Sequence, residues 1–194
     1  MATNLPSGLT AGTYAIDPSH SQATFTVRHA GISKVRGSLA IADGNITIGD
    51  DVESSNVVAA IDAKSVNTGD AGRDGHLQSA DFWDAEKNPT WNFVSTAVEA
   101  DDDDFVIAGD LTINGVTKPV KLETEFTGTA VDAYGNSRAG FEAETEISRK
   151  EFGLTWNVAL EAGGVLVGDK IKIALDLSAI KQACASRPRP APPS

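Results

Sequence analysis

The stretch FVIAGDLTINGVTKPVKLETEF, residues 105–126, decides the fold class of this 194-residue chain. Apolar residues recur at every second position before Asn114-Gly115, and the alternation resumes after it. Such alternation is typical of a β-strand with one buried face. Asn-Gly favours the two-residue type I′ turn, in which both central residues have a positive φ. The stretch therefore predicts an antiparallel hairpin.

The same period extends along the chain on both sides of this hairpin. Further strands are predicted near residues 22–29, 35–41, 46–48, 57–61, 91–98, 139–147 and 171–177. Asp43-Gly44 is interpreted as a second hairpin signal, and the four aspartates at 101–104 as a solvated hairpin tip. In the segment 91–98, the inner face is expected to include Ala97. About eight strands joined by short turns predict an all-β fold, either an up-and-down antiparallel barrel or a sandwich.

Residues 65–83, SVNTGDAGRDGHLQSADFW, interrupt the alternation. Turn-forming residues dominate the first half of this segment. In an all-β chain, a single irregular or helical insertion typically covers one end of the sheet, so we expect a short lid here. Arg73 and Asp74 are interpreted as a pair that attaches the lid to the barrel rim, and an anion clamp is the alternative.

Small residues are frequent on the predicted inner faces, and aromatic residues make up only 6% of the chain. An eight-stranded barrel has the size at which the interior is either packed or holds one small ligand. The small side chains favour a tunnel. Solid cores also contain alanine and valine, so composition alone leaves a self-packed barrel open.

Composition and charge exclude several classes of protein. The net charge of −11 argues against nucleic acid as a partner and against adhesion to anionic lipid surfaces. No run approaches the ~20 apolar residues of a membrane span. The start of the chain lacks the features of a signal peptide, so a cytoplasmic location is expected. We expect a loose lead-in at residues 1–12, one domain at 13–181, and a disordered proline-rich tail at 182–194.

The three histidines predict no metal site. His20, His29 and His76 lack tight ligand spacing with one another or with Asp74 and Asp81. Hydrogen-bonded structural histidines are the preferred interpretation, and no metal or cofactor is expected.

A catalytic triad is not expected either. Asp17, His20 and Ser21 lie close in sequence, but neighbouring residues of an extended chain point to opposite faces. The chain also has no GxSxG, no P-loop and no GxGxxG in a strand–helix context. We therefore predict that the protein is not an enzyme.

Four segments carry a resemblance to a known family. They are His20-Ser21 with Phe25 and His29; Ser65 and Thr68 followed by Arg73-Asp74, His76-Leu77, Ser79, Asp81-Phe82 and Asp84; Gly109–Val120; and Arg149 with Phe152 and Gly153. Together they resemble the bacterial YceI-like family of lipocalin-like, polyisoprenoid-binding proteins, over about residues 12–181. The resemblance implies an extended eight-stranded antiparallel barrel whose apolar tunnel holds a long-chain isoprenoid, and pairing as a homodimer.

The candidate ligand-binding residues combine strand phase with positions in the lid. Tunnel-lining candidates are Phe25, Val27, Leu39, Ile61, Phe93, Ile107, Phe126, Phe141 and Trp156, with Phe82 and Trp83 in the lid. Head-group candidates are His29, Arg73 and His76. Trp83 stands where the family usually has a smaller aromatic residue, and we expect its larger ring to shorten the tunnel.

The leading interpretation is non-catalytic binding, transport or storage of a long-chain isoprenoid, an isoprenoid quinone or a similar fatty lipid. Each methylene removed from water contributes roughly 0.8 kcal/mol, so a long tail supplies affinity without directional contacts. Two alternatives stay open at this point. One is an enzyme acting on such a lipid with His29 or His76 as general acid–base, and the other is a stress-related dimer with a packed core.

Overall fold

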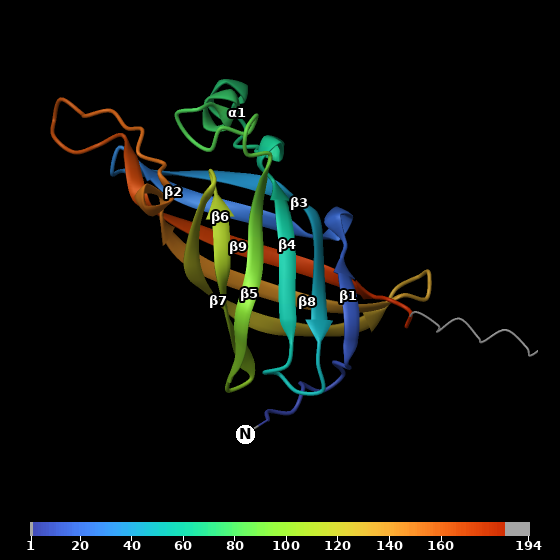
Figure 1. Ribbon diagram of the computed structural model, residues 1–194. Helices are drawn as coiled ribbons and strands as arrows, with labels where there is room; N and C mark the ends of the chain where they lie inside the picture. The colour runs from blue at the N-terminus through green and yellow to red at the C-terminus, as the bar shows by residue number, and fades with distance from the viewer. Residues whose placement is uncertain (1, 185–194) are drawn as a thin grey trace, which may run out of the picture.

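Nine strands form one antiparallel sheet in the computed structural model, which describes residues 2–184 (Figure 1). They are β1 Gly12–Ile16, β2 Gln22–His29, β3 Ser33–Ile48, β4 Asn56–Asp62, β5 Thr90–Asp101, β6 Asp104–Ile113, β7 Val116–Val131, β8 Ser137–Ser148 and β9 Val167–Lys181. The sheet order is β1-β3-β2-β9-β8-β7-β6-β5-β4. Pairing of β3 with β4 closes the eight strands numbered from β2 to β9 into a barrel. The predicted eight-stranded antiparallel barrel is confirmed.

Strands β1 and β2 share one position in the barrel wall. Both lie between β3 and β9. Strand β1 pairs with the last residues of β3 and β9, and β2 pairs with the earlier residues of the same two strands. The short 3-10 helix η1, Pro18–His20, separates them. Nine strands therefore occupy eight positions.

The hairpin predicted at Asn114-Gly115 is confirmed. Asn114 has φ 54° and Gly115 has φ 71°, and the β6–β7 ladder begins directly beside them with Ile113 opposite Val116. The aspartate run is confirmed as a hairpin tip, because β5 ends at Asp101 and β6 begins at Asp104. Local turn chemistry is thus sufficient to place these two connections.

The hairpin predicted at Asp43-Gly44 is wrong. Strand β3 continues through both residues, with a register shift against β4 between Ile41 and Asp43. The irregularity moves the buried face from odd-numbered to even-numbered residues. A Cβ added at Gly44 would lie 2.6 Å from the Cδ1 atom of Ile16, so glycine allows β1 to pack closely against the bend.

A second irregularity overturns the predicted phase of β5. The register against β6 shifts between Ser95 and Ala97. Ala97 is therefore exposed, and Val98 takes the buried position with 7% exposure. A one-residue shift sends every later side chain of the strand to the opposite face.

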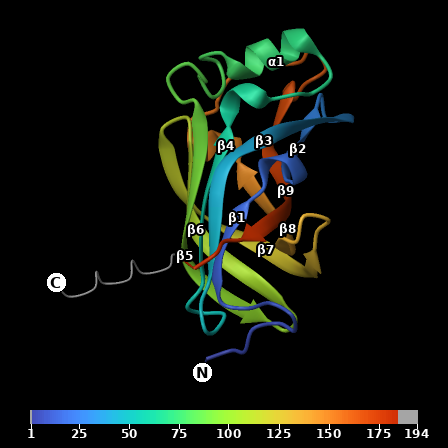
Figure 2. The same cartoon turned by 90° about the vertical axis from the view of Figure 1, so that its right-hand side faces the viewer.

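The predicted lid is confirmed as a segment that covers one end of the barrel. It contains one helix, α1 Ala71–Gln78, whose N-terminus is capped by the Asp70 carboxylate accepting from the Arg73 backbone N–H at 2.8 Å. The lid and the N-terminus lie at opposite ends of the barrel in both views (Figures 1 and 2). No helix within residues 2–184 is long and apolar enough to cross a membrane.

The lid also fills a gap in the wall. The first half of β3 pairs with β2 but not with β4, which leaves one edge of it free. Ser38 and Asn67 exchange backbone hydrogen bonds of 2.9 Å there, and the Ser65 hydroxyl accepts from the Ala40 N–H at 2.7 Å. The lid thus continues the hydrogen bonding of the sheet where the strands diverge.

The lead-in is attached more firmly than the sequence suggests. Residues 2–11 form no helix or strand, yet Leu9 is buried and Thr3 binds the Glu53 carboxylate through its N–H at 2.9 Å and its hydroxyl at 2.6 Å. The expectation of a loose lead-in is therefore corrected. Most of the predicted disordered tail, from residue 185 on, lies outside the described residues.

Candidate functional site

An apolar cavity runs inside the barrel. Its volume is about 100 Å³. Its wall consists of Leu5, Leu9, Ile16, Ile41, Ile46, Ile48, Val52, Ser55, Val57, Ala59, Ile61, Trp91, Phe93, Val98, Phe105, Ile107, Leu111, Val120, Leu122, Thr124, Phe141, Ala143, Thr145, Ile173, Leu175 and Leu177. None of these residues carries a charge. Such an interior favours an apolar occupant over water.

Different segments contribute to the two ends of the cavity wall. Leu5 and Leu9 of the lead-in, together with Val52 of the β3–β4 loop, belong to the end away from the lid. Trp91 belongs to the lid end, because it is the second residue of β5, the first strand after the lid, and because it contacts Trp83 of the lid. Sequence reasoning missed the lead-in residues, because they show no strand period.

A stack of three aromatic residues lies between the lid and the cavity. The rings of Trp83 and Trp91 meet edge to face, with centroids 5.2 Å apart, and Phe25 contacts Trp83 in the same manner at 6.4 Å. The Trp83 indole N–H donates to the Ala63 carbonyl at 3.0 Å, which fixes its orientation. Trp83 is buried without reaching the cavity, so it covers Trp91 from the lid side.

A second aromatic group joins the lid to the loop before β9. The His76 ring packs edge to face against Trp156 at 4.6 Å and Phe82 at 5.1 Å, and its Nε2 lies 2.9 Å from the Asp81 carboxylate. None of these residues belongs to the cavity wall. The contacts are those of a histidine that joins the lid to the loop before β9.

The structure places four of the predicted ligand-binding residues in the cavity wall and the others elsewhere. The four are Ile61, Phe93, Ile107 and Phe141. Outside the wall lie Phe25, Val27, Leu39, Phe126 and Trp156, the lid residues Phe82 and Trp83, and the head-group candidates His29, Arg73 and His76. Of these, Phe25 and Leu39 are buried core residues in the lid-side half of the barrel. Ligand contact by any of these residues stays a prediction.

Arg73 and Asp74 act together on Thr68 within the lid. The Arg73 guanidinium donates to the Thr68 hydroxyl at 2.8 Å and to its carbonyl at 3.0 Å. The Asp74 carboxylate accepts from the Thr68 N–H at 2.9 Å and from its hydroxyl at 2.6 Å. The direct attachment to the rim predicted for this pair is not observed, because both side chains stabilise the lid loop itself.

Arg149 is a buried structural residue whose role sequence reasoning missed. It is 1% exposed, and its guanidinium donates to the carbonyls of Gly168 at 2.8 Å, Trp156 at 2.9 Å, Val167 at 3.2 Å and Leu154. Burial lowers its pKa. Arginine nevertheless stays charged at neutral pH. It thereby joins the loop after β8 to the start of β9.

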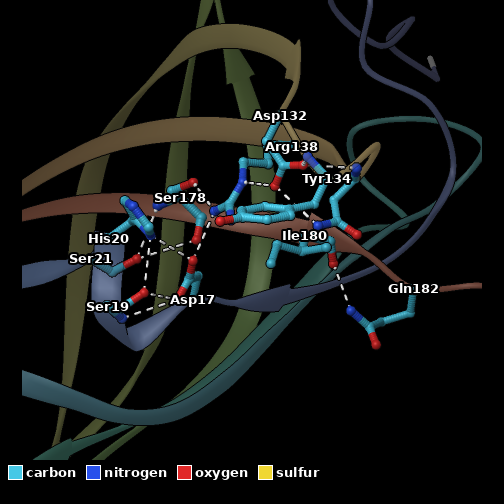
Figure 3. Close-up of polar contacts among 11 residues, drawn as sticks. Asp17, Ser19, His20, Ser21, Asp132, Tyr134, Arg138, Ser178, Ile180 and Gln182 are labelled. Carbon is cyan, nitrogen blue, oxygen red and sulfur yellow. Dashed lines mark hydrogen bonds and ion pairs between the residues drawn. The ribbon is translucent and has the colours of Figure 1, made fainter.

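A polar cluster connects η1 to the β7–β8 turn at the outside of the barrel (Figure 3). The Arg138 guanidinium donates to Asp17 at 2.8 Å, to Asp132 at 2.8 Å and to the Ser178 hydroxyl at 3.1 Å. The Ser19 hydroxyl donates to Asp17 at 2.7 Å. The cluster thus ties together segments that lie far apart in the sequence.

The same cluster corrects the geometric reason given for excluding a triad. The turn of η1 folds the chain back, so His20 Nδ1 lies 2.8 Å from the Asp17 carboxylate. The Ser19 hydroxyl meets the same nitrogen at 3.0 Å, and the Ser21 hydroxyl donates to the Ser178 carbonyl at 3.3 Å. A relay needs the carboxylate and the hydroxyl on opposite ring nitrogens. This arrangement does not supply one.

Two carboxyl groups of this cluster have lowered pKa values. The Ser19 hydroxyl and the Arg138 guanidinium hold the pKa of Asp17 well below its ordinary value. Arg138 and the Asn136 N–H do the same for the pKa of Asp132. A carboxylate with a lowered folded-state pKa adds stability above its unfolded pKa, and this stability is lost as the pH falls toward the folded value.

Replacing Arg138 with glutamine is therefore expected to weaken the protein most at neutral pH. The urea midpoint of the wild type should fall as the pH drops below about 4, while that of Arg138→Gln should be lower at pH 7 and change less. The two curves are expected to converge in acid. Lys170→Gln is a suitable control, because its ion pair with Glu146 is largely exposed. A constant offset between wild type and Arg138→Gln at every pH would contradict the prediction.

The chain matches known proteins over most of its length. The YceI-like domain profile covers residues 14–179. The chain is 43% identical to Protein YceI from Escherichia coli O17:K52:H18 over 147 residues, which is 74% of this chain and 77% of that protein.

Solved structures agree in fold. A crystal structure of the Campylobacter jejuni YCEI protein matches with a TM-score of 0.65 and 30% identity, over 80% of this chain and 90% of that one. A polyisoprenoid binding domain from Saccharophagus degradans matches with a TM-score of 0.62 and 14% identity, over 89% of this chain and all of that one. At that identity the second likeness concerns the fold alone.

Proposed function

The chain belongs to the YceI-like family, and from that premise we propose that it binds a long-chain isoprenoid, or a similar amphiphilic lipid, inside the barrel. The observation that carries the proposal is the apolar cavity with its uncharged wall. The solved neighbour described as a polyisoprenoid binding domain has the same fold, which supports the same class of ligand.

Carriage or storage of the ligand is preferred over its chemical conversion. His29 and His76, the candidates for general acid–base catalysis, both lie outside the cavity wall. The residues that form the wall offer apolar surface, and burial of a long tail against it supplies affinity that grows with chain length. A homodimer and a cytoplasmic location stay predictions.

Extraction of the purified protein tests the proposal. Freshly purified protein is denatured in organic solvent, and the extract is analysed by mass spectrometry. A stoichiometric long-chain amphiphile is expected. An empty extract, still empty after incubation with geranylgeraniol, would leave the packed barrel as the correct interpretation.

A further inference from the structure

One buried polar atom of a cavity-wall residue has no hydrogen-bond partner among the described residues. Trp91 belongs to the wall and is 6% exposed, and its Nε1 is the buried side-chain nitrogen without a hydrogen-bond partner among the described residues. The contrast with Trp83 is direct, because the Trp83 N–H donates to the Ala63 carbonyl. A buried donor left unpaired costs roughly 1–3 kcal/mol, so such groups are rare and usually meet a partner.

Two other polar wall residues, Thr124 and Ser55, differ from Trp91 in this respect. The Thr124 hydroxyl donates to the Leu122 carbonyl at 3.3 Å, and the Ser55 hydroxyl donates to Asp51 at 3.2 Å. The unpaired donor therefore belongs to a residue at the lid end of the cavity wall, where other atoms cover its Nε1. An occupant that widens the cavity at this point would bring an acceptor atom to it.

We propose that Trp91 determines which lipid is bound, by donating its indole N–H to an uncharged oxygen of the ligand at the lid end of the cavity. The occupant is thus an isoprenoid with a carbonyl, ether or hydroxyl oxygen, which narrows the ligand class on which the proposed function rests. A phosphate at this place is disfavoured, because the wall offers no cation and a buried unpaired charge is costly.

A matched pair of ligands tests the role of Trp91. Phytone is a ketone with a saturated isoprenoid chain, and phytane is a closely related hydrocarbon without an oxygen. Trp91→Phe keeps an aromatic ring and removes the donor. The variant is expected to lose about tenfold more affinity for phytone than for phytane. Equal weakening of both ligands, or of neither, would overturn the inference and leave the proposed function intact.

Nuclear magnetic resonance gives a readout that does not depend on a variant. The chain has three tryptophans, so ¹⁵N-labelled protein shows three indole N–H resonances. The Trp91 resonance is expected to move downfield with phytone and not with phytane. No difference between the ligands would count against the hydrogen bond. Failure to bind either ligand would overturn the proposed function and this inference together.

A separate observation concerns the way into the cavity. The ladder between β7 and β8 runs from the pair of Val131 and Ser137 to the pair of Glu123 and Glu144, where it stops. Beyond that point β7 continues only beside β6, and β8 only beside β9. An outer pocket occupies the gap, and two of its lining residues, Val120 and Thr145, also belong to the wall of the inner cavity. The divergence between β3 and β4 differs from this gap, because the free edge of β3 is hydrogen-bonded to the lid.

We infer that this gap is the portal through which the apolar tail enters, an inference that also rests on the proposed function. The cavity volume of about 100 Å³ is small for a long chain, so the wall has to widen during uptake. Widening at the gap breaks no ladder hydrogen bonds, whereas widening elsewhere in the paired wall does.

A disulfide across the gap tests the portal. Extending the register by two residues places Lys121 opposite Glu146, so Lys121→Cys with Glu146→Cys should close it. Glu125→Cys with Glu142→Cys is the matched control, since these residues are already paired on the same strands. Both variants carry Cys184→Ser.

Oxidation is expected to slow uptake of geranylgeraniol about tenfold in the gap variant and to leave the control unchanged, with reduction restoring the rate. If the disulfide does not form, a short bismaleimide serves as the cross-link. Equal uptake rates before and after cross-linking in the gap variant would overturn the portal. Absence of equilibrium binding in every variant would instead overturn the proposed function.

Discussion

Replacing Arg149 with methionine is expected to lower the free energy of unfolding by about 4 kcal/mol. The guanidinium supplies donors to four carbonyls in a position that is 1% exposed. Methionine keeps much of the apolar stem of the side chain but leaves these carbonyls without partners, and each unpaired buried group costs roughly 1–3 kcal/mol. Urea unfolding followed by tryptophan fluorescence measures the change.

Arg36→Met is the matched control for Arg149→Met. Arg36 is exposed on β3, so the same substitution there is expected to change stability by no more than about 0.5 kcal/mol. A loss below about 1 kcal/mol for Arg149→Met would contradict the structural role, since it would mean that water replaces the guanidinium at little cost.

Replacing Ala143 with phenylalanine is expected to abolish ligand binding while the protein still folds. Ala143 lies in the middle of β8, is 3% exposed, and belongs to the cavity wall. A ring at this position occupies the space that an isoprenoid tail would take. The added volume costs at most about 1–3 kcal/mol of stability, because the ring enters an existing cavity. Loss of geranylgeraniol binding, measured by calorimetry, together with an unchanged circular dichroism spectrum, is the expected result.

Ala97→Phe is the matched control for Ala143→Phe. Simple alternation predicts that Ala97 faces the interior, but the register shift in β5 exposes it. The control variant is expected to bind geranylgeraniol normally. Normal binding by Ala143→Phe would mean that the cavity of the barrel is not the binding site. Loss of binding by Ala97→Phe would mean that β5 follows the uninterrupted phase.

Local signals in the sequence predicted much of the fold. The strand at residues 22–29 coincides with β2, and Asn114-Gly115 determines its own turn because the required φ values are intrinsic to those residues. The errors at Asp43-Gly44 and Ala97 share one cause. A register shift depends on which strand lies alongside, and that information is absent from the strand's own alternation.

The candidate site was less predictable than the fold. Ile61, Phe93 and Ile107 were found by strand phase, which works wherever the ladder is regular. Leu5 and Leu9 were missed because a segment without regular structure shows no period. Simple alternation places Trp91 on the same face as Phe93, but only the structure shows that its indole nitrogen is unpartnered.

The position shared by β1 and β2 has a consequence for how the chain folds. Both strands pair with β9, so the first and last strands of the barrel are neighbours and the ring closes only when the C-terminal strand arrives. During synthesis, β1–β8 emerge as an open sheet whose future cavity wall faces solvent. Contacts between such distant segments make folding slow, because the entropy of the intervening chain is lost before the contacts form. The lipid binding that we propose therefore requires that β9 has been synthesised and has closed the ring.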